Sequence, residues 1–406
     1  MRILFVHQNF PGQFLHLAPA LVQRGHEVLA MGDDANKRPT PINIARYMYK
    51  RPDLAKTVPR LAVTFADNAA RGAVVAQAAT EMKRKSGYQP DVVFGHIGWG
   101  ESLFLKEVWP NARHLLYAEL FYQPRGLDTS FDPELQRDDE NQRIWITSRQ
   151  AHLLLAMHTT DEAVAPTQWQ ANSFPDYMRS RIDVIHDGID TQRVKPDPTA
   201  KFKIPGSELE LRAGEEVLTF VNRNLEPYRG YHTFMRALPK ILAQRPRAHA
   251  VIVGSDGVSY GSKPKQGGSW KEIFLNEVRD RLDMSRVHFV GHLPYPAFVS
   301  LMQVTRVHAY LTYPFVLSWS MLEAMSAGAL VVGSKTPPVE EVITDGENGR
   351  LVDFFDVEAW SSTLTDALAE PKRFMPLRNA ARRTIVERYD LHTHCLPRMI
   401  DFVEKP

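Results

Sequence analysis

The stretch that decides the fold is residues 2–31, RILFVHQNFPGQFLHLAPALVQRGHEVLAM. A short apolar run, Arg2–His7, leads through a loop to apolar residues at helical spacing from Phe14 to Val22. Gly25 stands where a glycine commonly ends a helix, and a second short apolar run, Glu27–Met31, follows it. A strand, a helix and a strand in this order predict a parallel sheet with right-handed crossovers.

The same alternation continues along the chain and is interrupted once. A turn-rich segment, His186–Pro205, carries three prolines, and we place the domain linker there. Before it we expect strands at 91–95, 114–118 and 182–185, and helices at 101–108 and 139–157. After it we expect strands near 217–221, 248–253, 287–290, 307–311, 330–333 and 349–352. Helices are expected near 231–243, 270–282, 295–302, 320–326, 339–343 and 357–368, with a mostly helical tail over 377–403.

This pattern predicts two successive doubly wound α/β domains. In such sheets the ligand lies beyond the carboxyl ends of the strands, and with two facing domains it lies in the cleft between them. The residues that directly follow strands are therefore the candidates for a functional site.

Composition excludes several classes of protein. The chain has 406 residues, and 49 Lys and Arg against 47 Asp and Glu leave a net charge of +2, which does not indicate a nucleic-acid binder. The one cysteine, Cys395, rules out intramolecular disulfides and cysteine-rich zinc sites. No apolar run reaches the roughly 18–20 residues of a membrane span, and the N-terminus does not resemble a signal peptide. We therefore expect a cytoplasmic protein.

Several catalytic motifs are missing from the sequence. It contains no G-x-G-x-x-G dinucleotide fingerprint, no P-loop, no H-E-x-x-H and no G-x-S-x-G. No two aspartates are spaced as Asp-x-Asp, so a metal-chelating motif of that type is also missing.

Two loops carry groups suited to an anion. Gly12 precedes a predicted helix, where backbone N–H groups can approach a negative charge, although a plain tight turn explains it equally well. Arg223 and Arg229 lie six residues apart in a loop after the first strand of the second domain, and two guanidinium groups can neutralise a diphosphate. The alternative is two solvated arginines.

A third loop leads into a helix that begins near Ser318–Ser320, whose N-terminus favours an anion. Glu323, expected on its first turn, can accept hydrogen bonds from the two hydroxyls of a ribose. Equally, Ser320 and Glu323 are spaced as a capping box, in which Glu323 accepts the Ser320 backbone N–H.

Weaker candidates follow other strands. Gly254 and Ser255 lie in a loop that can hold a base through backbone groups, or that is an ordinary turn. In the first domain, imidazole, indole and carboxylate groups follow two strands. Such groups suit a sugar, although a lone His or Glu after a strand is more often structural or solvated. The residues are His96, Trp99, Glu101 and Glu119.

Taken together, these loops resemble the retaining glycosyltransferases of family 4, of the bacterial group 1 type, over nearly the whole chain. The resemblance implies the GT-B fold, in which two Rossmann-like domains face each other across a cleft. Residues 1–187 would then form the acceptor-side domain, 188–385 the nucleotide-sugar-binding domain, and 386–406 a helix that crosses back onto the first domain.

The resemblance also implies roles for residues. Arg223 and Arg229 match the basic pair that binds the donor diphosphate, with Arg229 in place of the usual lysine, and Glu323 matches the glutamate that binds the ribose. The first glutamate of the family pair is replaced by Phe315, which leaves the contacts to the sugar open. The predicted catalytic residues are Arg223, Arg229, Glu119 and His96. The predicted acceptor-binding residues are Trp99 and Glu101, and the predicted donor-binding residues are Gly12, Asn222, Gly254, Ser255, Leu317, Ser318, Trp319, Ser320 and Glu323.

The function implied is transfer of a hexose, with retention, from a UDP- or GDP-linked sugar to a glycan or lipid-linked acceptor, as in polysaccharide biosynthesis. No metal or other cofactor is expected, because the arginines and the helix N-terminus would stabilise the leaving diphosphate. Two alternatives are kept: a GT-B-type epimerase or phosphorylase, and a non-catalytic sugar-nucleotide-binding scaffold, which Phe315 favours.

One further segment bears on the acceptor. Residues 44–60 interleave basic side chains with tyrosines, and such segments can lie on anionic membranes. Peripheral contact with the inner face of a membrane is one interpretation, and a solvated loop or helix face is the other.

Overall fold

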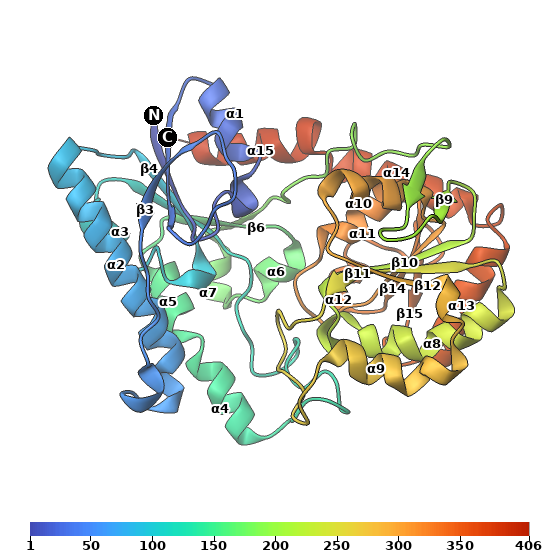
Figure 1. Ribbon diagram of the computed structural model, residues 1–406. Helices are drawn as coiled ribbons and strands as arrows, with labels where there is room; N and C mark the ends of the chain where they lie inside the picture. Colours follow the sequence, from blue (N-terminus) through green and yellow to red (C-terminus); the bar gives the residue numbers. More distant parts are fainter. Residues whose placement is uncertain (406) are drawn as a thin grey trace. The chain divides into compact units, whose positions relative to one another are not determined.

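A computed structural model describes residues 1–405, so Pro406, the last residue of the predicted C-terminal segment, lies outside the described residues. The chain forms two compact units. Of the described residues, the first comprises 1–130, 136–187 and 392–405, and the second comprises 131–135 and 188–391. Each unit is built around its own parallel sheet with helices on both faces (Figure 1). The fold predicted from the sequence, two Rossmann-like α/β domains, is confirmed.

The first unit contains a seven-stranded parallel sheet whose inner strands are buried on both faces. The register places Leu4 beside Leu29 on one side and Val93 on the other. Across the sheet the strands are β3 (Asn43–Tyr47), β2 (Glu27–Asp33), β1 (Arg2–Val6), β4 (Val92–His96), β5 (Arg113–Tyr117), β6 (Glu162–Ala165) and β7 (Ile182–Val184).

Helices from both ends of the chain cover one face of this sheet. α1 (Leu17–Gln23) and α15 (Leu396–Glu404) pack there side by side (Figure 1). Phe402 of α15 lies against Phe94, with ring centroids 6.1 Å apart. Arg24 pairs with Glu404 at 2.6 Å. The C-terminal helix thus belongs to the first unit.

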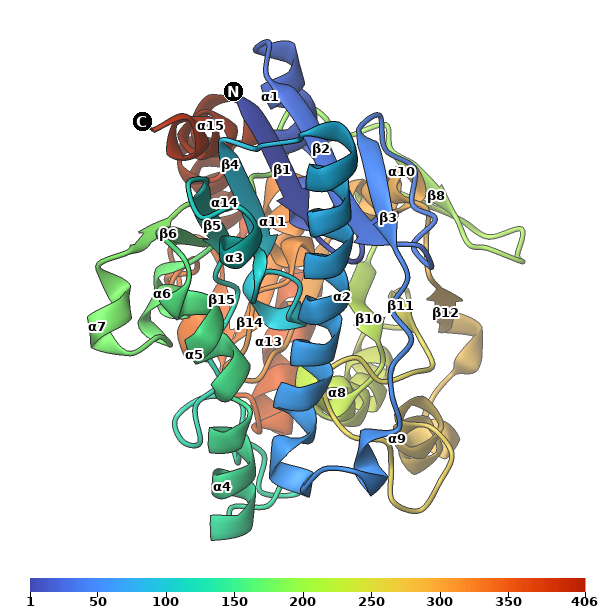
Figure 2. The same ribbon diagram turned by 90° about the vertical axis from the view of Figure 1, so that its left-hand side faces the viewer.

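The other face is covered by α2 (Val63–Ser86), which runs along the sheet in Figure 2, and by α5 (Ala151–His158). Val75 and Ala79 of α2 pack on Leu4 and Val93. The shorter helices of this unit are α3 (Leu105–Val108), α4 (Glu140–Ser148), α6 (Gln168–Asn172) and α7 (Asp176–Arg179).

The second unit repeats the architecture with a six-stranded parallel sheet. Its order, with the earliest strands inside and the reversal between β10 and β13, is the doubly wound order. The strands are β12 (Val287–Gly291), β11 (His249–Ser255), β10 (Val217–Asn224), β13 (Val307–Tyr310), β14 (Leu330–Ser334) and β15 (Arg350–Val352). A small antiparallel pair, β8 (Lys201–Lys203) and β9 (Glu210–Arg212), precedes them.

Apolar stripes on the helices explain how they cover this second sheet. Phe234 of α8 (Tyr231–Gln244) stacks on Phe220 with centroids 4.5 Å apart. α9 (Trp270–Val278) and α13 (Val357–Ala369) pack on the same face as α8, and the opposite face carries α10 (Tyr295–Val304), α11 (Trp319–Ser326) and α14 (Met375–Arg388). A short helix, α12 (Pro337–Glu340), follows β14.

The structure corrects several expected elements. The single helix expected over 139–157 is two helices, α4 and α5, separated by a turn at 149–150. The first helix begins at Leu17, after a 3-10 turn at Gly12–Phe14, and not at Phe14. Part of the segment 44–60, taken as a loop or a helix face, belongs to β3 because its backbone pairs with β2 and Tyr47 is buried. Strands β6, β8 and β9 and helices α2, α6 and α7 were not predicted.

Candidate functional site

In the second unit, two loops meet at the point where the strand order reverses. β10 and β13 are neighbours in the sheet, but the next strand lies outward of each, on opposite sides. Ligands of doubly wound sheets bind beyond the carboxyl ends of the strands at this point. The loop after β10 carries Arg229, and the loop after β13 spans residues 311–318.

Arg229 joins the two loops. It is buried, and its Nη1 donates hydrogen bonds to Thr312 Oγ1 at 2.8 Å and to the Val316 carbonyl at 2.9 Å. The rings of Tyr260 and Phe315 flank its guanidinium, with centroids 5.1 and 5.6 Å from Cζ. Guanidinium groups bind acceptors and aromatic faces together in this way. A permanent positive charge is therefore fixed at the reversal point of the sheet.

The N-terminus of α11 lies beside this charge. Ser318 caps the helix, and its backbone N–H donates to the Tyr310 hydroxyl at 2.8 Å. The same hydroxyl oxygen accepts a longer bond, 3.4 Å, from Arg229 Nη1. Trp319, the first residue of the helix, is 43% exposed. Arg229 and the helix N-terminus thus share Tyr310, which places two positive electrostatic features together.

Glu323 faces a tyrosine and not the start of its own helix. Because α11 begins at Trp319, Glu323 lies beyond the first turn where we expected it. Its Oε1 accepts a 2.8 Å bond from the Tyr295 hydroxyl, while the Ser320 backbone N–H is capped by Ser318. The capping-box interpretation is therefore wrong.

The surroundings of Glu323 change its acidity. Its side chain is buried, and burial raises its pKa to about 7, although the Tyr295 hydrogen bond and the nearby Arg193 oppose the rise. Arg193 lies over the Tyr295 ring, 4.5 Å from its centroid. Glu323 therefore changes charge near neutral pH.

Phe315, where the family glutamate was expected, is part of the aromatic shell around Arg229. Its ring lies 5.4 Å from that of Tyr228 and 4.9 Å from that of Tyr260, and it is buried. This position supplies an apolar surface at the reversal point and no acceptor for a hydroxyl group.

Three further predicted donor residues, Asn222, Gly254 and Ser255, lie on strand ends. β10 extends to Asn224, so Asn222 and Arg223 belong to the strand itself, which was expected to end at Val221. Gly254 and Ser255 are the last residues of β11, and a Cβ on Gly254 would lie 3.0 Å from the Asn222 carbonyl oxygen. Leu317 is half-buried beside the cap of α11.

The two arginines differ in their surroundings. Arg229 is buried and bonded to protein groups, as described, whereas Arg223 is exposed. Within residues 1–405 Arg223 has no hydrogen bond or ion pair to another residue, so its guanidinium faces solvent. Only Arg229 is held in place by the fold.

In the first unit, imidazole groups meet at the corresponding reversal between β1 and β4. His7 and His96, at the ends of these strands, are buried with ring centroids 5.4 Å apart. The Gly98 N–H donates to His96 Nδ1 at 3.0 Å, so the proton of the neutral ring lies on Nε2, which is 3.7 Å from Glu119 Oε2. Burial lowers the pKa of His96 to about 3. The His96 ring is thus neutral, and within residues 1–405 its buried Nε2 has no hydrogen-bond partner.

Gly12 allows His7 to occupy this position. Gly12 has φ +50°, and a Cβ there would lie 2.9 Å from the His7 ring. His7 Nδ1 accepts the Asn9 N–H at 2.9 Å. Sequence reasoning did not single out His7, although it follows an apolar strand just as His96 does.

Trp99 and Glu101 lie in different environments. Trp99 is 39% exposed and stacks on His96 at 5.7 Å. Glu101 has no exposed surface, its Oε1 accepts a bond from the Tyr47 hydroxyl, and burial raises its pKa to about 7. The predicted role of Glu101 in binding an acceptor does not fit this burial, because a side chain without exposed surface cannot touch a ligand.

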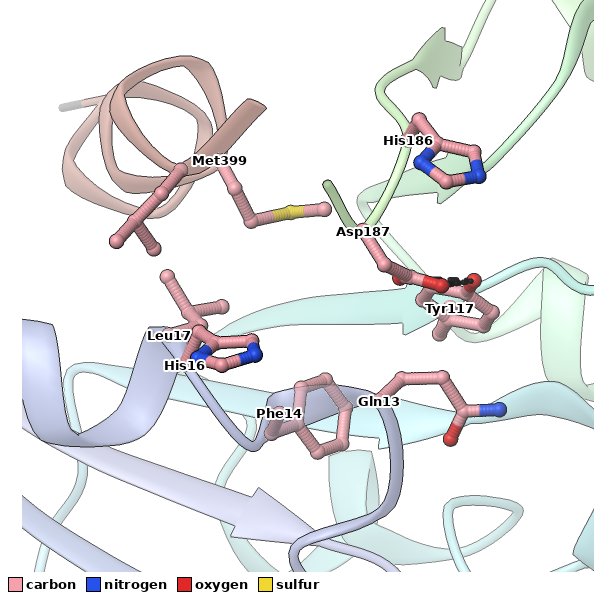
Figure 3. Close-up of a pocket in the computed structure, with 9 residues that line it drawn as sticks. Gln13, Phe14, His16, Leu17, Tyr117, His186, Asp187 and Met399 are labelled. Carbon is pink, nitrogen blue, oxygen red and sulfur yellow. Dashed lines mark hydrogen bonds between the residues drawn. The ribbon is translucent and has the colours of Figure 1, made fainter. Parts of the chain in front are cut away.

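The first unit also contains a small pocket (Figure 3). Gln13, which reaches Glu119 Oε1 at 3.4 Å, lines it together with the Tyr117 hydroxyl, which donates to both carboxylate oxygens of Asp187 at 3.0 Å. The other lining residues are Phe14, His16, Leu17, His186, Leu396 and Met399.

Comparison with known families identifies the chain. Residues 24–194 match the model of the glycosyl transferase family 4 group, and residues 207–384 match that of the glycosyl transferases group 1. The chain belongs to the family 4, group 1 glycosyltransferases. The family that the resemblance named is thus confirmed.

Among curated relatives, D-inositol 3-phosphate glycosyltransferase of Rhodococcus jostii is 26% identical over 50% of this chain and 43% of its own length. A GDP-mannose-dependent phosphatidylinositol monomannoside mannosyltransferase of Mycolicibacterium smegmatis is 25% identical over 52% of this chain and 53% of its own. The chain thus spans about half the length of these relatives.

Solved structures confirm the GT-B fold. HepE of Anabaena, in complex with UDP and glucose, has a TM-score of 0.64 and 17% identity, with 99% of each chain covered. Sucrose-phosphate synthase of Thermosynechococcus elongatus has a TM-score of 0.71 and 16% identity, covering 99% of this chain and 98% of its own.

Proposed function

We propose that this glycosyltransferase moves a sugar from a UDP- or GDP-linked donor to a hydroxyl of a glycan or lipid-linked acceptor, with retention and without a metal ion. The observation that carries the proposal is the bond between Arg229 and Thr312, which fixes a buried positive charge at the reversal point of the second sheet. Doubly wound sheets bind phosphate-containing ligands at that point.

The diphosphate would be bound at this charge. As the bond between the anomeric carbon and the phosphate oxygen breaks, negative charge develops on the departing diphosphate. Arg229, Arg223 and the N-terminus of α11 would stabilise that charge, and the loss of one such donor typically costs about 2.7–4 kcal/mol of barrier. Glu323 would accept the ribose hydroxyls.

The acceptor hydroxyl would attack from the face that the diphosphate leaves, which retains the anomeric configuration. The new C–O bond forms as the old one breaks, and the hydroxyl proton passes to the leaving phosphate oxygen or to Glu119. His96, neutral because of its burial, would contact Glu119, whose Oε2 lies 3.7 Å from its Nε2.

The lipid-linked acceptor is supported by one relative and one surface. The relative from Mycolicibacterium smegmatis is named for a phosphatidylinositol monomannoside. Met48 is 77% exposed, and the basic Lys50 and Arg51 follow it. We propose that this segment contacts anionic headgroups at the inner face of a membrane. No helix within residues 1–405 is long and apolar enough to cross a bilayer.

Product analysis tests the proposal. The enzyme is incubated in EDTA with UDP- and GDP-sugars and a panel of oligosaccharide and polyprenyl-linked acceptors, and the product is examined by NMR. An α-linked product from an α-linked donor is expected. A free sugar epimer, or a requirement for inorganic phosphate, would show an epimerase or a phosphorylase instead.

A binding scaffold without catalysis is the second candidate, and Phe315 favours it. This buried ring stands where the family places a glutamate that contacts the donor sugar. The scaffold predicts tight binding of a nucleotide-sugar and no turnover with any acceptor.

A further inference from the structure

Five residues from the middle of the first unit's sequence belong to the second unit. The chain on both sides of Phe131–Leu135, up to residue 130 and from 136, lies in the first unit. We call residues 131–135 the strap. Its position follows from its contacts, because the Phe131 ring packs on Phe354 at 5.3 Å and Phe355 at 5.2 Å.

Asp132 is the most deeply placed group of the strap. It is 1% exposed, and its Oδ2 accepts a hydrogen bond from the Tyr313 hydroxyl at 2.5 Å and lies 3.2 Å from His232 Nε2. Its Oδ1 accepts the N–H groups of Glu134 at 2.9 Å and Leu135 at 3.2 Å. A buried carboxylate bonded in this way fixes the groups around it.

Tyr313 connects Asp132 to the phosphate site. It directly follows Thr312, the acceptor of the Arg229 hydrogen bond, and its own N–H donates at 3.0 Å to the carbonyl of Tyr228, the residue before Arg229. The rings of Tyr228 and Tyr313 also pack, with centroids 4.8 Å apart. Tyr313 therefore ties together the two loops that hold Arg229.

We propose that Asp132 is a positioning residue for the sugar donor, acting through Tyr313 to hold the loops around Arg229. The inference rests on the proposed function, in which Arg229 binds the donor diphosphate. The carboxylate does not touch the donor; it anchors the Tyr313 side chain, and removing it frees the loop that supplies the acceptors for Arg229.

Glu134 offers a matched control within the same strap. It forms a bidentate ion pair with Arg236 at 2.7 and 2.8 Å, but its side chain is 48% exposed, and Arg236 is also paired with Glu277. Exposed pairs contribute little, and this one joins the strap to α8 and not to Tyr313. Removing Glu134 loosens the strap without releasing Tyr313.

The test compares Asp132→Ala, Tyr313→Phe, the double variant and Glu134→Ala in the full chain. Binding of UDP, GDP and their hexose derivatives is measured by calorimetry, and the KM for the acceptor is measured separately. For each single change at Asp132 or Tyr313, the donor Kd should rise about tenfold while the acceptor KM stays unchanged. The double variant should bind the donor no more weakly than Asp132→Ala does, since each single change already removes the same hydrogen bond. Glu134→Ala should bind like the wild type.

Tyr313→Phe keeps the ring packing and so remains informative if Asp132→Ala fails to fold. Unchanged donor binding in Tyr313→Phe, additive losses in the double variant, or an equal rise in acceptor KM would each overturn the inference. If the wild type binds no nucleotide, the proposed function fails first and the inference fails with it; wild-type binding with unaffected variants overturns the inference alone.

Discussion

The Tyr295 hydroxyl donates a 2.8 Å hydrogen bond to Glu323 Oε1. Tyr295 begins α10 and Glu323 lies within α11, so the bond joins two helices that pack on the same face of the second sheet. It holds the carboxylate proposed to bind the donor ribose in one orientation, and it lowers the pKa that burial has raised.

Tyr295→Phe should therefore weaken donor binding through the ribose. The change leaves the ring in place but removes the hydroxyl group that donates a hydrogen bond to Glu323. The carboxylate is then more often protonated and less well oriented. We expect the Kd for a UDP- or GDP-sugar to rise about fivefold at pH 7, the equivalent of about 1 kcal/mol. A 2′-deoxyribose donor should be affected less. An equal loss for both donors would show that Tyr295 does not act through Glu323.

Donor affinity should also depend on pH. Because burial raises the pKa of Glu323 to about 7, the carboxylate is mostly protonated at pH 6 and mostly ionised at pH 8. The ionised form accepts both ribose hydroxyls, so affinity for a nucleotide-sugar should increase with pH, by up to about tenfold over this range. Calorimetry at several pH values measures the change. Glu323→Gln should abolish it, and its persistence in that variant would contradict the assignment.

Glu101 in the first unit should make the free energy of unfolding decrease as the pH rises. Its folded pKa, about 7, lies above its ordinary value of 4.5, so the folded state holds a proton that the unfolded state releases. Stability is therefore lost as pH rises from about 4.5 to about 7, by about 3 kcal/mol. Glu101→Gln should remove that loss while keeping an acceptor for Tyr47. Denaturant unfolding at pH 5 and pH 8 measures it, and parallel curves for the two proteins would contradict the prediction.

Gly230 should tolerate no side chain, because it connects Arg229 to α8. It has φ +68°, and a Cβ there would lie 2.2 Å from Leu311 Cβ. Gly346 has a similar φ, +76°, but nothing lies within 4 Å of its Cβ position. Gly346→Ala should cost about 1–2 kcal/mol from backbone strain alone. Gly230→Ala should cost at least about 1–3 kcal/mol more from overpacking. Equal melting temperatures for the two variants would show that Leu311 gives way freely.

The sequence predicted the second unit well for a physical reason. Its inner strands are buried on both faces, so stretches such as Val217–Val221 and Leu330–Gly333 appear as plain apolar runs. α2 was missed because its buried face is made of Gly72, Val75 and Ala79, which give little hydrophobic contrast. β3 was missed because an edge strand keeps polar residues such as Asn43 and Arg46.

The candidate site was predictable only in part. The rule that ligands bind beyond the carboxyl ends of parallel strands selected Arg229, His96 and Glu323 from the sequence. It could not show that Asp132 bonds to Tyr313, because that contact joins segments far apart in the chain. Nor could it show that Glu101 is enclosed while Arg223 faces solvent, since both follow predicted strands in the same manner.

The most direct test of the account is nucleotide binding by Arg223→Ala and Arg247→Ala in the presence of EDTA. Both side chains are exposed. Arg223 lies at the carboxyl end of β10, whereas Arg247 lies just before the amino end of β11. The two changes alter the net charge equally. Calorimetry should show that the wild type and Arg247→Ala bind UDP or GDP alike and that Arg223→Ala binds about tenfold more weakly or not at all. Equal binding by all three proteins, or no binding by the wild type at millimolar nucleotide, would contradict a diphosphate site at this edge.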